Sequence, residues 1–303
     1  MKSIIRGFFS VILSIFICLS AFVYVATAVV KFKLADVEYY VKSVITDEYV
    51  AALRGDVYEN ITALCVNLEV KQDTVMSFVY DSDLKRISEV NLRATFSSLM
   101  NGTPLEYERF ESVDLKDEIN RELEEFANEM GIVGEDITEA SEITCEYIID
   151  NINTTFAYFT QENMDLVSFV SRIPGLNFIK DSAFFVTVSV LTVLCVVKFL
   201  IMGKRRVRSC FYNVSFMLWL ASTCWFAPVA VIKLQNIAMK IAIAHSSFRI
   251  YVQNLINAVI DGFFNVSLFA FIISTVLLIA SIVLIIIYVA RRDENTVGIN
   301  QNE

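Results

Sequence analysis

The sequence predicts an all-α, four-span helical membrane protein with a mainly helical extracytoplasmic domain between spans one and two. The chain of 303 residues is 55% hydrophobic and 19% charged, whereas a soluble protein is typically about 45–50% apolar and about 25% charged. It contains only 3 Pro and 9 Gly, which is too few turn-forming residues for a β-sandwich or a barrel. Four long apolar stretches, separated by more polar segments, complete the pattern.

Each of the four stretches is long enough to cross a bilayer. A spanning helix needs about 20 mostly apolar residues, because the hydrocarbon core is about 30 Å thick. The stretches are residues 4–30, 183–202, 210–232 and 263–290. The first also resembles a secretory signal peptide, but its apolar run of roughly 20 residues exceeds the ~7–15 of a signal. We therefore expect an uncleaved anchor; cleavage near Ala28 is the alternative and leaves the remaining topology unchanged.

Basic residues predict the orientation, because cytoplasmic loops carry an excess of Lys and Arg. Two clusters serve as topology determinants: Lys204, Arg205, Arg206 and Arg208 in one, and Arg291 and Arg292 in the other. With four spans, both clusters lie on the same side as the N-terminus. We therefore expect a plasma-membrane protein with both termini in the cytoplasm and residues 31–180 outside.

The expected domains are a membrane anchor at 1–30, an acidic helical domain at 31–180, a three-span region at 181–290 and a cytoplasmic tail at 291–303. The charge divides in the same way. Residues 31–180 hold 29 acidic and 13 basic residues, a net charge of −16, and the rest hold 5 and 12, a net of +7. A strongly negative outer domain argues against binding to nucleic acid. The cytoplasmic segments are too short to house an enzyme.

Local patterns in the acidic domain are helical. Leu34, Val37, Val41 and Val44 recur on one helix face, as the spacing of 3 or 4 requires. The segments 103–106 and 136–139 each look like a helix start, with a polar cap and a Glu three residues later. Residues 61–80 are rich in Val, Thr and Tyr and leave room for a short β-hairpin within the helical bundle.

Cys65 and Cys145 are the only cysteines in this domain. An even pair in an exported domain permits one disulfide, so these two are candidate partners, with two buried free thiols as the alternative.

The outer loop at 233–262 has the pattern of two amphipathic helices joined near Ser246, with Gly262 as the expected stop. The first is marked by Leu234, Ile237, Ala238, Ile241 and His245. The second carries a candidate interaction face of Phe248, Tyr251, Val252, Leu255 and Val259. We expect this face to pack on the acidic domain; the alternatives are the membrane interface or a partner helix.

Small residues recur at intervals of seven in two spans and predict helix-packing seams, since they let helices approach closely. They are Ser14, Ala21 and Ala28 in the first span and Ser267, Ser274 and Ser281 in the fourth. The seams predict close helix packing, either within one chain or between copies of the chain. Lys198 is the ionisable group within the later spans, and we expect it to snorkel to the headgroups, with a transport role as the alternative.

No motif of known chemistry is present. The chain has one histidine, His245, and lacks a His-Glu-x-x-His zinc motif, a Cys-x-x-Cys pair, a phosphate loop and a nucleophile elbow. We therefore predict no enzyme, no catalytic residue, no cofactor, no metal and no identifiable small-molecule ligand.

The layout of one span, a large outer domain and three further spans resembles that of FtsX-type permease subunits of ABC systems. Those subunits have a longer cytoplasmic segment where the ATPase docks, whereas residues 203–209 are too short for a coupling helix. Their activity is therefore not carried over. The sequence favours an accessory, sensory or assembly subunit that acts in the bilayer through a protein partner or a homo-oligomer. An oligomeric channel or small-molecule transporter is the alternative.

Overall fold

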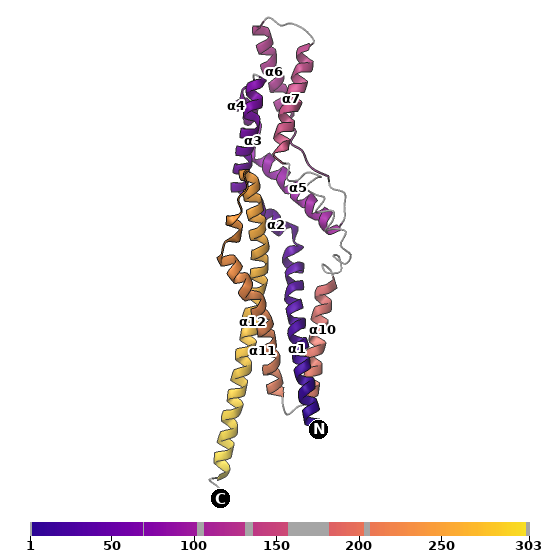
Figure 1. The fold of residues 1–303 in the computed structure, drawn as a ribbon, viewed down its shortest axis with the longest axis vertical. Helices are drawn as coiled ribbons and strands as arrows, with labels where there is room; N and C mark the ends of the chain where they lie inside the picture. Colours follow the sequence, from indigo (N-terminus) through magenta and orange to yellow (C-terminus); the bar gives the residue numbers. More distant parts are fainter. Residues whose placement is uncertain are drawn as a thin grey trace. The chain divides into compact units, whose positions relative to one another are not determined.

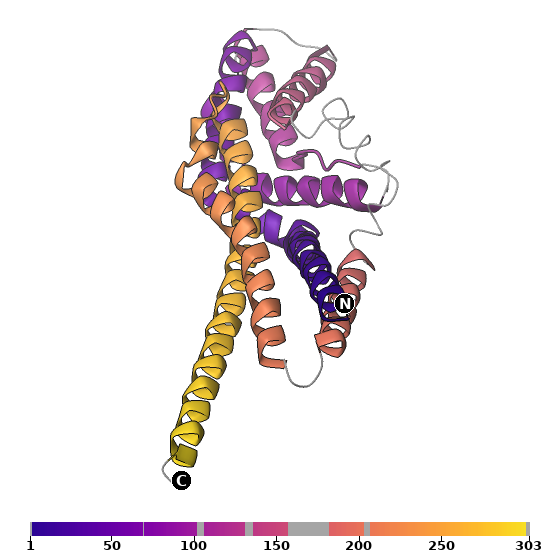
Figure 2. The same ribbon diagram turned by 60° about the horizontal axis from the view of Figure 1, so that its bottom comes forward.

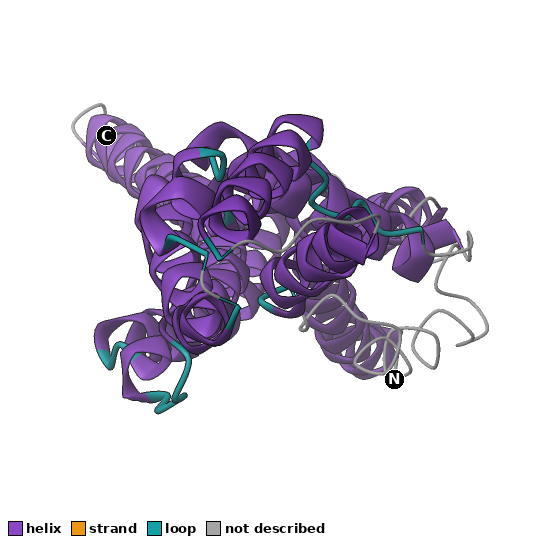
Figure 3. Ribbon diagram, turned by 90° about the horizontal axis from the view of Figure 1, so that it is seen from above, coloured by secondary structure: helices purple, strands orange, loops and turns teal. Residues whose placement is uncertain are grey.

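The computed structural model describes residues 2–68, 70–101, 106–130, 136–156, 182–202 and 207–300. These ranges contain helices, turns and loops but no strand (Figure 3), which confirms the all-α prediction. The chain forms two compact units. The membrane unit comprises residues 1–36, 175–237 and 259–303, and the acidic unit comprises residues 37–174 and 238–258.

Four helices are long and apolar enough to cross a membrane, as predicted. They are α1 (Lys2–Val29), which continues through a π-helical turn at Val30–Leu34, and α10 (Phe184–Met202), α11 (Val207–Leu234) and α12 (Ser246–Asn300). Within the membrane unit, α1 packs against both α10 and α11 (Figures 1 and 2). Aromatic side chains join α11 to α12: the rings of Phe226 and Phe271 stack at 5.0 Å.

Helix α12 differs from the expected pattern of the 233–262 loop. It runs for 55 residues through Gly262, which was the expected stop. A glycine inside a helix costs only about 1 kcal/mol relative to alanine, and apolar helical segments on both sides of Gly262 offset that cost. The first expected helix is reduced to a single 3₁₀ turn at Ile237–Lys240, preceded by Asn236 in the left-handed region at φ 47°.

The acidic unit is a bundle of six helices within the described residues, together with the start of α12. The six are α2 (Val37–Val44), α3 (Asp47–Asn67), α4 (Gln72–Ser77), α5 (Asp81–Asn101), α6 (Val113–Glu129) and α7 (Asp136–Thr154). Helix α3 packs against α4, α5 and α7. Large side chains such as Tyr49, Leu53 and Ile61 fill the core and are fully buried. Among the described residues of 61–80 the expected hairpin is replaced by the end of α3 and by α4.

Side-chain caps explain where two of these helices begin. The Thr46 hydroxyl accepts a hydrogen bond from the Tyr49 amide at 3.3 Å at the start of α3, and Ser112 accepts one from the Leu115 amide at 3.2 Å at the start of α6. The helix start expected at 103–106 falls mostly on residues outside the described ranges. Residues 106–112 are not helical, so α6 begins later than predicted.

Two asparagines hold the non-helical segment before α6. The Asn91 amide donates to the Glu108 carbonyl at 3.0 Å and accepts from the Glu108 amide at 2.8 Å. Asn153 makes the same two-way pairing with Phe110, at 3.1 and 2.8 Å. Buried backbone groups require partners, and these two side chains supply them in place of a helix.

Candidate functional site

The start of α12 is held by a carboxylate from another helix. Asp56 on α3 is only 7% exposed. Its two oxygens accept hydrogen bonds from the Ser246 hydroxyl at 2.7 Å and from the Ser247 amide at 2.9 Å, and the Ser247 hydroxyl also donates to it. The first amides of a helix lack internal partners, and negative charge is favourable there. Asp56 thus acts as an external N-terminal cap that fixes α12 to α3, and we refer to this contact as the α12 joint.

The α12 joint keeps Asp56 ionised. Burial alone raises the pKa of the Asp56 carboxyl, but the hydrogen bonds from Ser247 and Ser246, with a smaller contribution from His245, outweigh burial and place the pKa below its ordinary value. A carboxyl whose pKa is lower in the folded state stabilises that state above its ordinary pKa. The stabilisation is lost as the pH falls through the folded-state pKa.

The candidate interaction face is used partly for packing inside the chain. Tyr251 and Leu255 pack against the core of the acidic unit, and the ring of Tyr251 lies 6.1 Å from that of Tyr49 and 6.5 Å from that of Phe248. Val252 and Val259 are half-buried. On the same stretch of α12, the Asn254 amide donates to the Val44 carbonyl at 3.1 Å. The first turns of α12 are therefore part of the acidic core.

Lys198 on α10 is fully buried, and the prediction that it snorkels is wrong. Its ammonium donates to the Ser14 hydroxyl of α1, which in turn donates to the Ser10 carbonyl at 2.9 Å. Cys195 and Cys210, which belong to the same apolar cluster as Ile17 and Val214, lie close to Lys198. A charge or polar group within a span is costly and is retained where it has a partner or a function, so the Lys198–Ser14 pair is the second candidate site.

All six residues of the two predicted seams are buried: Ser14, Ala21, Ala28, Ser267, Ser274 and Ser281. The Ser274 hydroxyl meets the Ser222 hydroxyl of α11 at 2.6 Å. Ser267 and Ser281 instead donate to carbonyls of their own helix, at Phe264 and Leu278. The small side chains thus lie inside the membrane unit, where they allow close packing.

Of the topology determinants, Lys204, Arg205 and Arg206 lie outside the described residues, as does the side chain of Arg292. Arg208 on α11 stands with its guanidinium 3.7 Å from the ring centre of Tyr288 on α12, and Arg291 is exposed. The contact of Arg208 with Tyr288 is a cation–π interaction that joins the two helices.

The candidate disulfide between Cys65 and Cys145 is not formed. Both side chains are free thiols, buried in one core on α3 and α7. Burial raises the pKa of each thiol, which disfavours the thiolate and leaves both groups unreactive.

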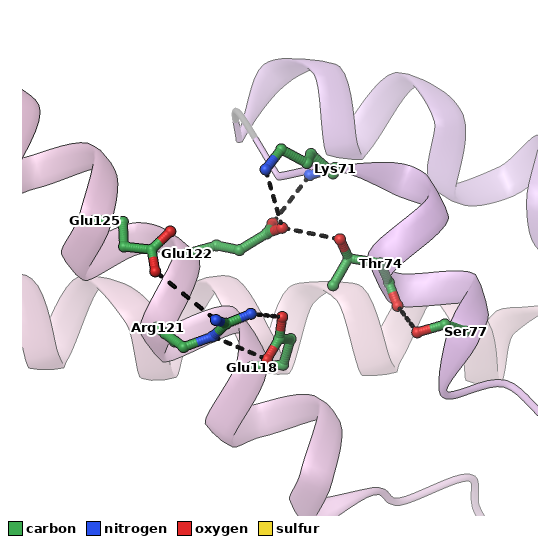
Figure 4. A network of polar contacts seen from close by, with 7 residues as sticks. All are labelled: Lys71, Thr74, Ser77, Glu118, Arg121, Glu122 and Glu125. Carbon is green, nitrogen blue, oxygen red and sulfur yellow. Dashed lines mark hydrogen bonds and ion pairs between the residues drawn. The ribbon is translucent and has the colours of Figure 1, made fainter.

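Acidic side chains elsewhere in the unit serve as caps and ion pairs. Glu122 on α6 accepts hydrogen bonds from the Lys71 amide at 3.2 Å and the Thr74 hydroxyl at 2.8 Å, at the start of α4, while Arg121 pairs with Glu118 and Glu125 (Figure 4). Among the described residues, no group of three or more His, Cys, Asp or Glu is placed to hold a metal ion.

The sequence and the structure were compared with known proteins. The chain matches no protein-family model, and no curated protein or solved structure is similar to it.

Proposed function

We propose that this is a multi-pass plasma-membrane protein that acts through protein contacts, as an accessory, sensory or assembly subunit. In this proposal the acidic unit faces outward and both termini are cytoplasmic. The four spanning helices support the membrane location. The basic residues at 204–208 and 291–292 support the orientation.

The observation that carries the proposal is the continuity of α12. Its first residues, up to Ala258, belong to the acidic unit, and the rest belongs to the membrane unit. The α12 joint at Asp56 holds one part of the helix, and the contact of Ser274 with Ser222 holds another. A partner that moves α3 thereby acts on a backbone that continues into the bilayer, which is what a sensory or accessory subunit needs.

The test is purification of the full chain in a mild detergent, followed by native mass spectrometry of everything that remains bound. We expect a homo-oligomer or a partner at fixed stoichiometry. Asp56→Ala should reduce the retained partner, whereas Asp47→Ala should not, because Asp47 makes only an exposed ion pair with Lys85. A monodisperse monomer with nothing bound contradicts the proposal.

A transporter or channel is the second candidate, and the buried Lys198–Ser14 pair favours it, because ionisable groups inside a membrane often mark ion or proton paths. The test is ion flux in liposomes that contain the purified chain. Flux that Lys198→Met abolishes favours the transporter. Absence of flux favours the accessory subunit.

A further inference from the structure

The membrane unit contains a half-open cavity of about 590 Å³, lined by residues of α1 and the turn after it, α10, α11 and α12. Ligand sites in proteins usually measure roughly 300–1,000 Å³, so this cavity is large enough for a ligand. Its wall is mainly apolar and includes Ala21, Val25, Leu191, Leu218, Phe269 and Leu277.

The length of the cavity corresponds to one leaflet of a bilayer. On α12 it extends from Asn265 to Leu277, and twelve residues at a rise of 1.5 Å give about 18 Å. Half of the hydrocarbon core measures about 15 Å. The cavity begins near Lys33, in the π-helical turn after α1, and near Asn265, seven residues beyond the last α12 residue of the acidic unit. From there it reaches to about mid-membrane.

Two polar side chains at this end are suited to a ligand headgroup. Lys33 lines the cavity and carries a positive charge, and Asn265 lies on the facing helix. The Asn265 side chain is exposed and makes no hydrogen bond with any residue that the structure describes. An amide without a partner at the edge of the hydrocarbon is costly, so a ligand that accepts its hydrogen bond gains from doing so.

The serine and threonine hydroxyls deeper in the cavity are already paired. Ser222 and Ser274 bond to each other at 2.6 Å, and the Thr192 hydroxyl donates to the Val188 carbonyl at 2.8 Å. Apart from Tyr24, the deep part therefore presents a mainly apolar surface to a ligand, whereas the charged group Lys33 and the amide of Asn265 lie at one end. A lipid has a matching arrangement, with an apolar acyl chain and an acidic, oxygen-rich headgroup at one end.

We propose that the cavity binds one acyl chain of an anionic glycerophospholipid, with Asn265 donating to an ester carbonyl and Lys33 attracting the phosphate. A membrane helix from a second copy fits this end less well, because its backbone carbonyls are already paired within the helix. The lipid supplies an acceptor for Asn265, and its phosphate is attracted by the positive charge of Lys33.

The first test compares phosphatidylglycerol with phosphatidylcholine of the same acyl chains, titrated into the full chain in detergent and counted by native mass spectrometry. One basic group near an anionic surface contributes about 1 kcal/mol, so we expect phosphatidylglycerol to bind about five-fold more tightly. Lys33→Gln should remove this preference. Lys31→Gln should keep it, because Lys31 lies over the ring of Phe185 at 4.9 Å and does not line the cavity.

The second test fills the cavity. Ala270→Trp places a large ring among the lining residues and should abolish binding of both lipids. The matched control is Val276→Trp, on the same helix at a position that is 60% exposed and outside the lining, and it should bind as the unaltered chain does. If Ala270→Trp does not fold, the two lysine variants decide.

Equal binding of both lipids to the unaltered chain overturns the proposal. So does a preference that survives Lys33→Gln, or lipid binding that persists in a folded Ala270→Trp variant. Conversion of a dimer into monomers by Ala270→Trp, with lipid binding unchanged, assigns the cavity to a second copy instead.

Discussion

The two units differ in the side chains that dominate their interiors. In the acidic unit most of the largest buried residues are apolar, as Tyr49 and Leu53 illustrate. In the membrane unit small and polar residues are buried, such as Ser14 and Ser274, while Phe8, Phe16 and Phe269 are more than half exposed.

The difference follows from the solvent that each surface meets. Water drives large apolar side chains into a core, but lipid tails are as apolar as leucine and give no such drive. Spanning helices therefore associate through close packing and hydrogen bonds. Equivalent substitutions should consequently have different effects in the two units.

The largest expected contrast is between two leucines. Leu53→Ala removes a fully buried side chain on α3 and should lower the free energy of unfolding by about 3 kcal/mol. Leu19→Ala changes a side chain on α1 that is 56% exposed and should cost less than about 1 kcal/mol in lipid. Unfolding in bicelles with increasing denaturant measures both. Equal losses would mean that Leu19 has a packing partner.

Breaking the α12 joint should have the next largest effect. Asp56→Ala leaves the first amides and hydroxyls of α12 without their acceptor and should cost about 2 kcal/mol. The folded-state pKa of Asp56 lies below its ordinary value of 3.8. The unaltered chain should therefore keep this stabilisation above pH 3.8 and lose it as the pH falls through the folded-state pKa. The variant should lack this acid-dependent loss.

Hydrogen exchange of the amides at 247–249 reports the joint directly. We expect faster exchange there in Asp56→Ala and no change in Asp47→Ala. Protection of these amides in both variants would show that another group caps α12.

In the membrane unit, bulk at a seam should cost more than loss of a hydroxyl. Ser267→Val adds volume at a fully buried position of the α12 seam, outside the cavity, and should destabilise the folded state by about 1–2 kcal/mol. Ser274→Ala should cost about 0.6 kcal/mol, since the Ser222 hydroxyl also donates to the Trp219 carbonyl at 2.9 Å. Thermal unfolding in detergent ranks the two. The reverse ranking would mean that hydrogen bonding outweighs packing at this seam.

The smallest effect should come from an exposed ion pair. Arg93 on α5 contacts both oxygens of Glu38 on α2, at 2.8 and 3.1 Å, and its hydrogen bonds lower the pKa of Glu38. Exposed pairs contribute little and are screened by salt. Arg93→Gln should therefore shift the unfolding midpoint only slightly, and less in 0.5 M salt than at low salt. A shift that grows with salt would contradict an ion pair.

The sequence could predict features that depend on residues close together in the chain, such as helices and spanning segments. Four apolar runs long enough to span a bilayer were visible from the order of residues along the chain, and so was the helical class. Contacts between distant residues were not visible. The sequence predicts that Lys198 reaches the headgroups, because its partner, Ser14, is 184 positions away and no local pattern marks it. Gly262 looked like a helix stop because local propensity carries no information about the helical segments that continue through it.

Separation along the chain also explains why the sequence did not predict the hydrogen bonds of Asn91, Asn153 and Asp56 in the acidic unit. Asn91 and Asn153 pair with backbone groups 17 and 43 positions away, and no local pattern marks such a pairing. No local pattern marks Asp56 as a cap. Only the fold brings it to the start of α12, 190 residues later.

The sidedness of the two units is tested most directly by labelling single cysteines with a membrane-impermeant maleimide in intact cells, in a variant from which the six native cysteines have been removed. Glu124→Cys in the acidic unit should label without permeabilisation. Arg291→Cys, beyond the apolar part of α12, should label only after the membrane is opened. Labelling of Arg291→Cys but not Glu124→Cys in intact cells, or equal labelling of both, would contradict an outward-facing acidic unit and cytoplasmic termini.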